Sequence, residues 1–245
     1  MPARKPAEST KTRATAAPRK PAAAPARASR KRAPGRPAAR SGEDGTDLRR
    51  RLLQVAIERY ARDGMAGASL RDIAEGAGVT PAMLHYYFGG KAALRTAVIE
   101  EVLMPVVSGL RAPLQRSEND VGALIAGFVE AVSEVAHAHP WLPPLWVREV
   151  LHADGALRGL LKERLGPMLA RAMAERFADA QRAGHLNPRL DPRLLVPSLI
   201  GQTLFIAASA PLWREVLNAH DVDRSQLCDH TLELLRNGLE LSHEL

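Results

Sequence analysis

Residues 80–91 bring together side chains that can bind a nucleic acid through hydrogen bonds and apolar contacts. The hydroxyl of Thr80 can bind a phosphate oxygen or a base edge, and Ala82 and Met83 can contact the methyl group of a thymine. The ammonium of Lys91 stands where a new helix is expected to begin, and the free N–H groups of a helix N-terminus attract anions. This is the chemistry of recognition rather than of catalysis.

Two short helices are expected to position these side chains. Ser69 and Asp72 have the spacing of a capping box, which predicts the start of a helix that ends at the glycines of residues 76–78. Thr80 and Pro81 then form an N-cap followed by a proline at the first helical position, which opens a helix of about two turns that ends at Phe88. Two short helices joined by a glycine-containing turn form a helix-turn-helix, here at about 69–88.

Apolar residues recur with helical spacing through the rest of the chain. No segment alternates convincingly with a period of two, so the predicted fold class is all-α. Three further helices are expected before the Pro-rich segment 140–144: from Thr46 or Asp47 to Gly64, from Lys91 past Pro105, and from Ser117 or Asn119 to Pro140. A short helix that ends near Leu151 follows that segment. The last three are expected from Leu157 to Gly184, from Asp191-Pro192 to about Ala210, and from Asp223, capped with Gln226, to about 243.

The stretch from Leu70 to Leu94 resembles the DNA-binding domain of the tetracycline-repressor (TetR/AcrR) family, and the resemblance extends over about residues 47–105. Its matching features are Ile73-Ala74, Ala77-Gly78-Val79, Leu84, the aromatic trio ending in Phe88, Lys91 and Leu94. The resemblance implies a transcriptional regulator, most simply a repressor, with a DNA-binding domain at 46–106 and a helical ligand-binding and dimerisation domain at 107–245.

The helix 81–88 is then expected to enter the major groove. The resemblance implies that His85 and Tyr86 contact base edges and the DNA backbone. It also implies that Tyr87 contacts the DNA backbone and that Lys91 binds a phosphate. Tyr86 and Tyr87 could instead pack the small domain, and Pro81-Ala82 departs from the small polar residue and glycine that family members often carry there. The predicted DNA-binding residues are Ser69, Arg71, Thr80, Pro81, Ala82, Met83, His85, Tyr86, Tyr87 and Lys91.

The first 45 residues hold 12 Lys and Arg against 3 Asp and Glu, a net charge of +9, while the other 200 residues carry a net charge of −2. This segment has few large apolar side chains, so it is predicted to be disordered. A basic arm favours nucleic acid, although it could also serve only as a solubilising tail. Its Gly-Arg-Pro sequence is similar to an AT-hook, which makes Arg36 a candidate for an A·T-rich minor groove.

One two-turn helix contacts too few bases for specificity, so a homodimer is expected to bind a palindromic operator in double-stranded DNA. The dimer contact is predicted through the last two helices, at about 192–210 and 223–243. A small hydrophobic effector is expected among the middle helices, where aromatic and methionine side chains occur with a few polar groups. The predicted pocket residues are Phe128, Trp141, Leu145, Trp146, Glu149, His152, Met168, Met173, Phe177, Gln202 and Phe205.

Other classes of function have less support. Cys228 is the single cysteine, which favours a reducing cytoplasm, and a nucleoid-associated protein is expected. No uninterrupted run of about 18 apolar residues occurs, so no membrane span is predicted. No cofactor, metal site or catalytic residue is predicted, because phosphate loops, spaced ligand sets and an activated nucleophile are missing. A low-specificity architectural DNA-binding protein is the alternative.

Overall fold

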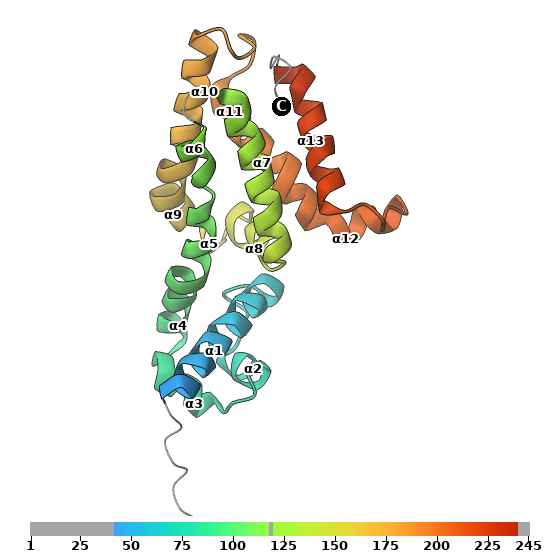
Figure 1. The fold of residues 1–245 in the computed structure, drawn as a ribbon. Helices are drawn as coiled ribbons and strands as arrows, with labels where there is room; N and C mark the ends of the chain where they lie inside the picture. The colour runs from blue at the N-terminus through green and yellow to red at the C-terminus, as the bar shows by residue number, and fades with distance from the viewer. Residues whose placement is uncertain (1–41, 118–119, 240–245) are drawn as a thin grey trace, which may run out of the picture. The chain divides into compact units, whose positions relative to one another are not determined.

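The computed structural model describes residues 42–117 and 120–239, and within these ranges it consists of helices and turns with no strand (Figure 1). This confirms the all-α prediction. Residues 1–41 of the basic segment, with Arg36, lie outside the described residues; residues 42–45, which were predicted to be disordered, instead form the first turn of α1.

The N-terminal helices form a small unit that we call the head, residues 42–98. It comprises α1 (Gly42–Asp63), α2 (Leu70–Gly76), α3 (Pro81–Phe88) and α4 (Lys91–Val98). The helix α1 begins at least four residues before its expected start. Positive φ angles of +83° at Gly64, +68° at Gly78 and +76° at Gly89 turn the chain between these helices, a conformation that glycine adopts without steric cost.

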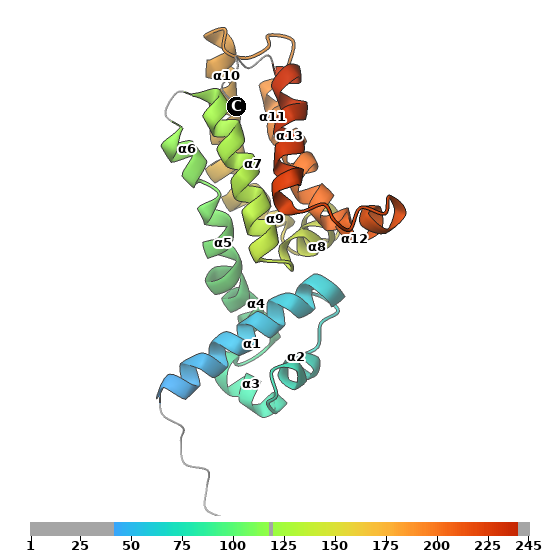
Figure 2. The same cartoon turned by 45° about the vertical axis from the view of Figure 1, so that its right-hand side comes forward.

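The helix α4 continues beyond the head, as expected. A π-helical segment, η1 (Ile99–Leu103), leads into α5 (Met104–Gly109), and α6 (Ala112–Arg116) follows after a turn. Pro105 is the second residue of α5 and lies directly after the π-helical segment, within the continuous helical run. One nearly continuous rod therefore extends from the head to the middle helices (Figure 2).

The middle helices begin with α7 (Val121–Ala138), whose N-cap is Asp120 rather than the predicted Ser117 or Asn119. A short helix α8 (Leu142–Trp146) continues as η2 (Val147–Leu151). The predicted helix from Leu157 corresponds to three consecutive helical segments, which are α9 (Arg158–Leu160), η3 (Leu161–Arg171) and α10 (Ala172–Arg182).

The last helices are α11 (Pro192–Ile200), η4 (Gly201–Phe205), α12 (Ile206–Val216) and α13 (Arg224–Leu239). The first three form one helix that ends at Val216, so the predicted end near Ala210 is wrong. Pro211 does not stop this helix; a π-helical segment precedes it, and the indole Nε1 of Trp213 donates a hydrogen bond of 3.0 Å to the carbonyl of Ile206. Asp223 and Gln226 cap α13 reciprocally, as predicted.

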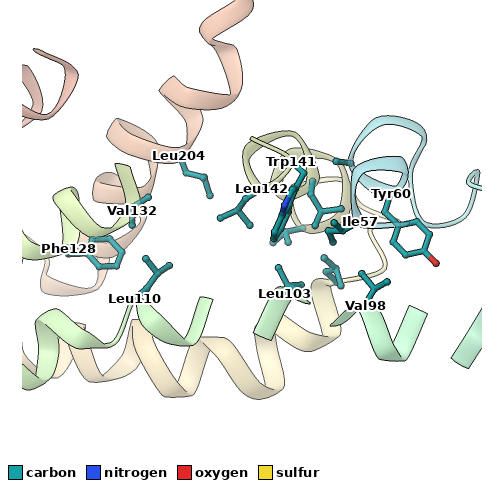
Figure 3. Close-up of a cluster of buried hydrophobic side chains, with 14 of the residues drawn as sticks. Ile57, Tyr60, Val98, Leu103, Leu110, Phe128, Val132, Trp141, Leu142 and Leu204 are labelled. Atoms are coloured by element: carbon teal, nitrogen blue, oxygen red, sulfur yellow. The ribbon is translucent and has the colours of Figure 1, made fainter. Parts of the chain in front are cut away.

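One buried apolar cluster joins the head to the middle helices. Figure 3 shows Ile57 and Tyr60 of α1 on one side and Phe128 and Val132 of α7 on the other, with Trp141 between them. Burial of these side chains supplies most of the driving force for folding. The head is therefore packed against the rest of the described chain rather than joined to it only by a linker.

Two helices are long and apolar enough to cross a membrane by length and composition, although no 18-residue run is free of polar residues. In α7, 39% of the apolar window is buried, as befits a core helix, whereas in the helix from Pro192 to Val216 only 28% is buried. A core or interface helix passes the same test, so this composition is weak support for a membrane span. It does identify Pro192–Val216 as an apolar helix with much uncovered surface.

Candidate nucleic-acid interface

The helix α3 has one buried side and one exposed side. Leu84 is fully buried and Phe88 is nearly so, and these two residues, four positions apart, fix the helix to the head. The side chains of Ala82, Met83 and Tyr86 are exposed. The structure therefore places these three predicted contact residues on the outward side of α3, while contact with DNA stays a prediction.

Thr80 is the N-cap of α3, as predicted, but its hydroxyl makes no capping hydrogen bond. The backbone carbonyl of Thr80 accepts from the N–H groups of Met83 and Leu84 at 3.0 and 3.4 Å. The side chain is exposed. Since the hydroxyl is not used to close the helix, it is available for a phosphate or a base edge.

The aromatic residues at the end of α3 differ in exposure. Tyr86 is 81% exposed, and its ring meets that of the half-buried Tyr87 edge-on, with 5.5 Å between the ring centroids. The Nδ1 atom of the exposed His85 lies 3.2 Å from the carbonyl oxygen of Gly89, so one ring nitrogen faces the turn that ends the helix. Tyr86 is thus more accessible than Tyr87, which packs partly against the core.

The residues predicted to bind phosphate are already engaged within the head. Lys91 Nζ donates a hydrogen bond of 2.7 Å to the carbonyl of Ala66, in the loop between α1 and α2. Ser69 Oγ accepts from the N–H of Asp72 at 3.1 Å, which confirms its role as N-cap. Arg71 is exposed. The position of the Lys91 ammonium is therefore linked to the conformation of that loop.

The end of α3 is supported by a residue that sequence reasoning missed. The Arg49 guanidinium of α1 lies over the ring of Phe88 and also forms an ion pair with Glu101 of η1. Hydrogen bonding by Arg49 lowers the pKa of Glu101 below its ordinary value. The neighbouring Glu100 pairs with Arg164 of η3, with 2.5 Å between Nη1 and Oε1. Two adjacent carboxylates thus connect the head and η3 to the same π-helical segment.

Most of the side chains predicted to line an effector pocket are packed in the core. Phe128, Met173 and Phe177 are fully buried, and Trp141 and Leu145 nearly so. Trp146, Met168 and Gln202 are half-buried, whereas His152 and Phe205 are exposed. The structure therefore places only some of these aromatic and methionine residues in the packed core, and the predicted role of the whole set in binding stays untested.

Two open pockets lie near the last helix. One of about 770 Å³ lies between the end of α7, α12 and the start of α13, and among the predicted pocket residues it includes only Gln202. The other, of about 690 Å³, is formed by α6, α7 and α13 and includes Cys228. Among the described residues, no group of three or more His, Cys, Asp or Glu side chains could hold a metal ion.

Glu149 occupies a position that its sequence context did not reveal. It is only 5% exposed, and its Oε1 accepts a hydrogen bond of 2.8 Å from the backbone N–H of Met65, directly after α1. Its Oε2 accepts from the N–H of Ala156 at 3.0 Å. Two adjacent charged residues, Arg148 and Glu149, interrupt the otherwise apolar stretch 145–151, but the partner of Glu149, 84 residues away, could not be read from the sequence.

Known proteins resemble this chain in sequence. The family model described as bacterial regulatory proteins, tetR family, matches residues 52–98. The HTH-type transcriptional regulator RutR of Escherichia coli (strain K12) is 29% identical over 170 residues, which cover 69% of this chain and 77% of RutR. The HTH-type transcriptional regulatory protein RaaS of Mycobacterium tuberculosis is 33% identical over 144 residues, covering 58% of this chain and 61% of RaaS.

Solved structures share the fold. The fatty acid degradation regulator FadR from Bacillus halodurans superimposes with a TM-score of 0.59 at 20% identity, covering 80% of this chain and 97% of that one. The FadR of Bacillus subtilis, solved in complex with stearoyl-CoA, gives a TM-score of 0.58 at 19% identity over 77% of this chain and 98% of its own. At these identities the likeness concerns the fold.

Proposed function

Since this chain belongs to the TetR family of bacterial transcriptional regulators, and is not an enzyme, we propose that it is a repressor that binds a palindromic operator as a homodimer. A small hydrophobic effector releases it. The observation that carries the proposal is the exposed face of α3, which is anchored by Leu84 and Phe88 and presents Thr80 and Tyr86 outward. Members of this family act in the cytoplasm, and we place this one on the nucleoid.

Exposed apolar side chains on the last helices support the homodimer. Large apolar side chains on monomeric surfaces are usually scattered, and a concentration of them marks an interface. The exposed members of this group, from the helix 192–216, the turn after it and α13, are Leu194, Phe205, Leu212, Val216, Leu217 and Leu234. We assign this surface, the apolar face, to contact with a second copy of the chain.

A dimer presents two copies of α3, and this is why we propose a palindromic operator. In helix-turn-helix dimers the two recognition helices are about 34–36 Å apart, which matches half-sites one helical turn apart. Arg71 and Lys91 supply the positive charge beside α3, and Arg36 of the basic segment is proposed for an adjacent minor groove. Deletion of residues 1–40 is expected to weaken binding and reduce its salt dependence without changing the preferred operator.

The effector site is proposed among the middle helices. Three π-helical segments, η2, η3 and η4, contain Glu149, Met168 and the pair Gln202 and Phe205 from the predicted pocket. Single π-helical segments within α-helices occur frequently at functional sites. Because Phe128, Trp141 and Phe177 of the predicted pocket are packed in the core, the effector must separate the middle helices as it binds, and this movement would change the position of the head.

Selection of duplexes from a random-sequence pool tests the proposal. The full chain should enrich a two-fold symmetric sequence, and footprinting should show a discrete protected site. Effector candidates are then added to the bound duplex, with stearoyl-CoA as one long-chain probe and free coenzyme A as its polar control. Diffuse, salt-sensitive coating of every duplex would instead support an architectural DNA-binding protein, and a stable monomer would contradict the dimer.

A further inference from the structure

We propose that Glu149 is a positioning residue for DNA binding, because it links the middle helices to Lys91 through the loop between α1 and α2. We call residues 64–69 the connector loop and residues 149–157 the clasp. The inference rests on the proposed function, and it adds a defined route by which the middle helices regulate the DNA-binding surface. The route follows from hydrogen bonds and close contacts within the described residues.

Within the clasp, residues 155–157 contact Glu149 at both its backbone carbonyl and its carboxylate. The backbone N–H of Leu157 donates to the carbonyl oxygen of Glu149 at 3.0 Å, and the N–H of Ala156 donates to its carboxylate Oε2 at 3.0 Å. A Cβ atom on Gly155 would lie 2.3 Å from the same carbonyl oxygen, so the two backbone segments are in close contact. Movement of residues 155–157, which lead directly into α9 and η3, must therefore move Glu149.

The second carboxylate oxygen fixes the connector loop. Oε1 accepts from the N–H of Met65 at 2.8 Å and would lie 3.3 Å from a Cβ atom on Gly64. Hydrogen bonds to an ionised acceptor are about twice as strong as neutral ones, and this one is buried. Loss of the acceptor would leave a buried N–H without its partner, at the usual cost of an unsatisfied donor.

The connector loop continues the route to the DNA-binding surface. One residue after Met65, the carbonyl of Ala66 accepts the hydrogen bond of 2.7 Å from Lys91 Nζ. The loop ends at Ser69, the N-cap of α2. Three consecutive links, from Ala156 to Glu149, from Glu149 to Met65, and from Ala66 to Lys91, thus join the start of α9 to the first residue of α4.

Paired variants test this route in the full chain, with a duplex enriched by the wild type from a random-sequence pool. Glu149→Gln keeps the size of the side chain but directs an amide N–H₂ at a backbone donor, and we expect it to weaken duplex binding about tenfold. Its control is Glu163→Gln, at an exposed position of η3. Gly155→Ala should act in the same direction from the far end, whereas Gly159→Ala, where a Cβ meets nothing within 4 Å, should not.

The salt dependence of binding separates this role from a general loss of stability. Removing a lysine–phosphate contact lowers the slope of log K against log salt concentration by about one. Glu149→Gln should lower the slope as Lys91→Met does, and the double variant should bind no more than slightly worse than Lys91→Met alone. Independent, additive effects of the two substitutions, or an unchanged slope, would overturn the proposal even if Glu149→Gln lowers the melting temperature.

Hydrogen exchange supplies a readout without DNA. In Glu149→Gln the backbone amide that faces the new N–H₂ group, that of Met65 or of Ala156, should exchange faster than in the wild type, and the amides of α13 should not change. Unchanged exchange at both Met65 and Ala156 would overturn the proposal. A wild-type chain that enriches no duplex would overturn the proposed function and this proposal together, whereas an enriched duplex bound equally by all variants would overturn this proposal alone.

Discussion

Arg49 lies over the aromatic ring of Phe88, with 5.0 Å between the guanidinium carbon Cζ and the ring centroid. The same guanidinium pairs with Glu101, so a single side chain of α1 connects the end of α3 to the segment that follows α4. A cation over an aromatic ring is attracted by the negative ring face, and here the ion pair fixes the orientation of the cation.

Arg49→Ala should therefore lower the free energy of unfolding by about 1 kcal/mol, the combined scale of an exposed cation–π contact and a surface ion pair. Urea denaturation followed by circular dichroism measures it. The matched control is Arg50→Ala, one residue along α1, whose side chain is 74% exposed and pairs with nearby Asp47. Equal losses in both variants would mean that the contact with Phe88 contributes nothing.

Substitutions on the two sides of α3 should separate binding from stability. Tyr86→Ala is expected to weaken duplex binding about tenfold, the scale of one lost specific contact, with the melting temperature unchanged because the side chain is exposed. Leu84→Ala should instead destabilise the head by about 2–5 kcal/mol, because it leaves a cavity in the core. Electrophoretic mobility shifts and thermal melts distinguish these results; a destabilised Tyr86→Ala would place that ring in the core.

Tyr60 is fully buried, and its hydroxyl has no hydrogen-bond partner among the described residues. Burial raises the pKa of Tyr60. Tyr60→Phe removes this unsatisfied group without leaving a cavity, so it should be neutral or should stabilise the chain by about 1 kcal/mol. Thermal denaturation at pH 7 tests this expectation. A clear loss of stability in Tyr60→Phe would reveal a hydrogen bond that the hydroxyl makes in solution.

The N-cap residue of α11, Asp191, makes the stability of the fold depend on pH in the acid range. Hydrogen bonds from the Arg193 guanidinium and backbone N–H lower the pKa of Asp191 from 3.8 to about 2. Because the folded-state pKa is depressed, this carboxylate contributes its stability fully above about pH 4. The contribution is lost as the pH falls toward 2. Carbon-13 NMR of the Asp191 carboxyl group measures the value, and Arg193→Ala should return it toward 3.8.

The apolar face gives a prediction about assembly. Leu212 is 66% exposed, and Leu212→Glu should convert the dimer into a monomer because a carboxylate would be buried at the contact. Sedimentation velocity measures the change. Leu151→Glu is the control, since Leu151 is also an exposed leucine but lies on η2, outside the apolar face. If both variants remain dimeric, the contact between copies lies elsewhere.

Local signals in the sequence predicted the helices near the proposed DNA-binding surface well. The helix α3 begins at Pro81 and ends at Phe88 as expected, because Thr80, the proline and the two following glycines act within a few residues of the helix ends. The caps at Ser69, Asp191 and Asp223 were recognised for the same reason.

Contacts between distant segments could not be predicted in this way. Glu149 was expected to line a pocket as a polar group, but its carboxylate binds the backbone of Met65, and no spacing rule relates positions 84 residues apart. Phe128 and Phe177 were assigned to the same pocket because aromatic residues suit both a binding site and a core. Composition does not separate these two roles, since packing is decided by the neighbours that the fold supplies.

The Glu149 carboxylate, which accepts from Met65 and Ala156, also affects how easily the head can separate from the middle helices. Packed apolar surfaces resist separation, because separating them exposes apolar side chains to water. A contact between a carboxylate and two backbone N–H groups behaves differently, because water can replace each hydrogen bond that is broken when the groups separate. This polar contact between η2 and the loop after α1 is therefore easier to open than the buried apolar cluster that joins the head to the middle helices.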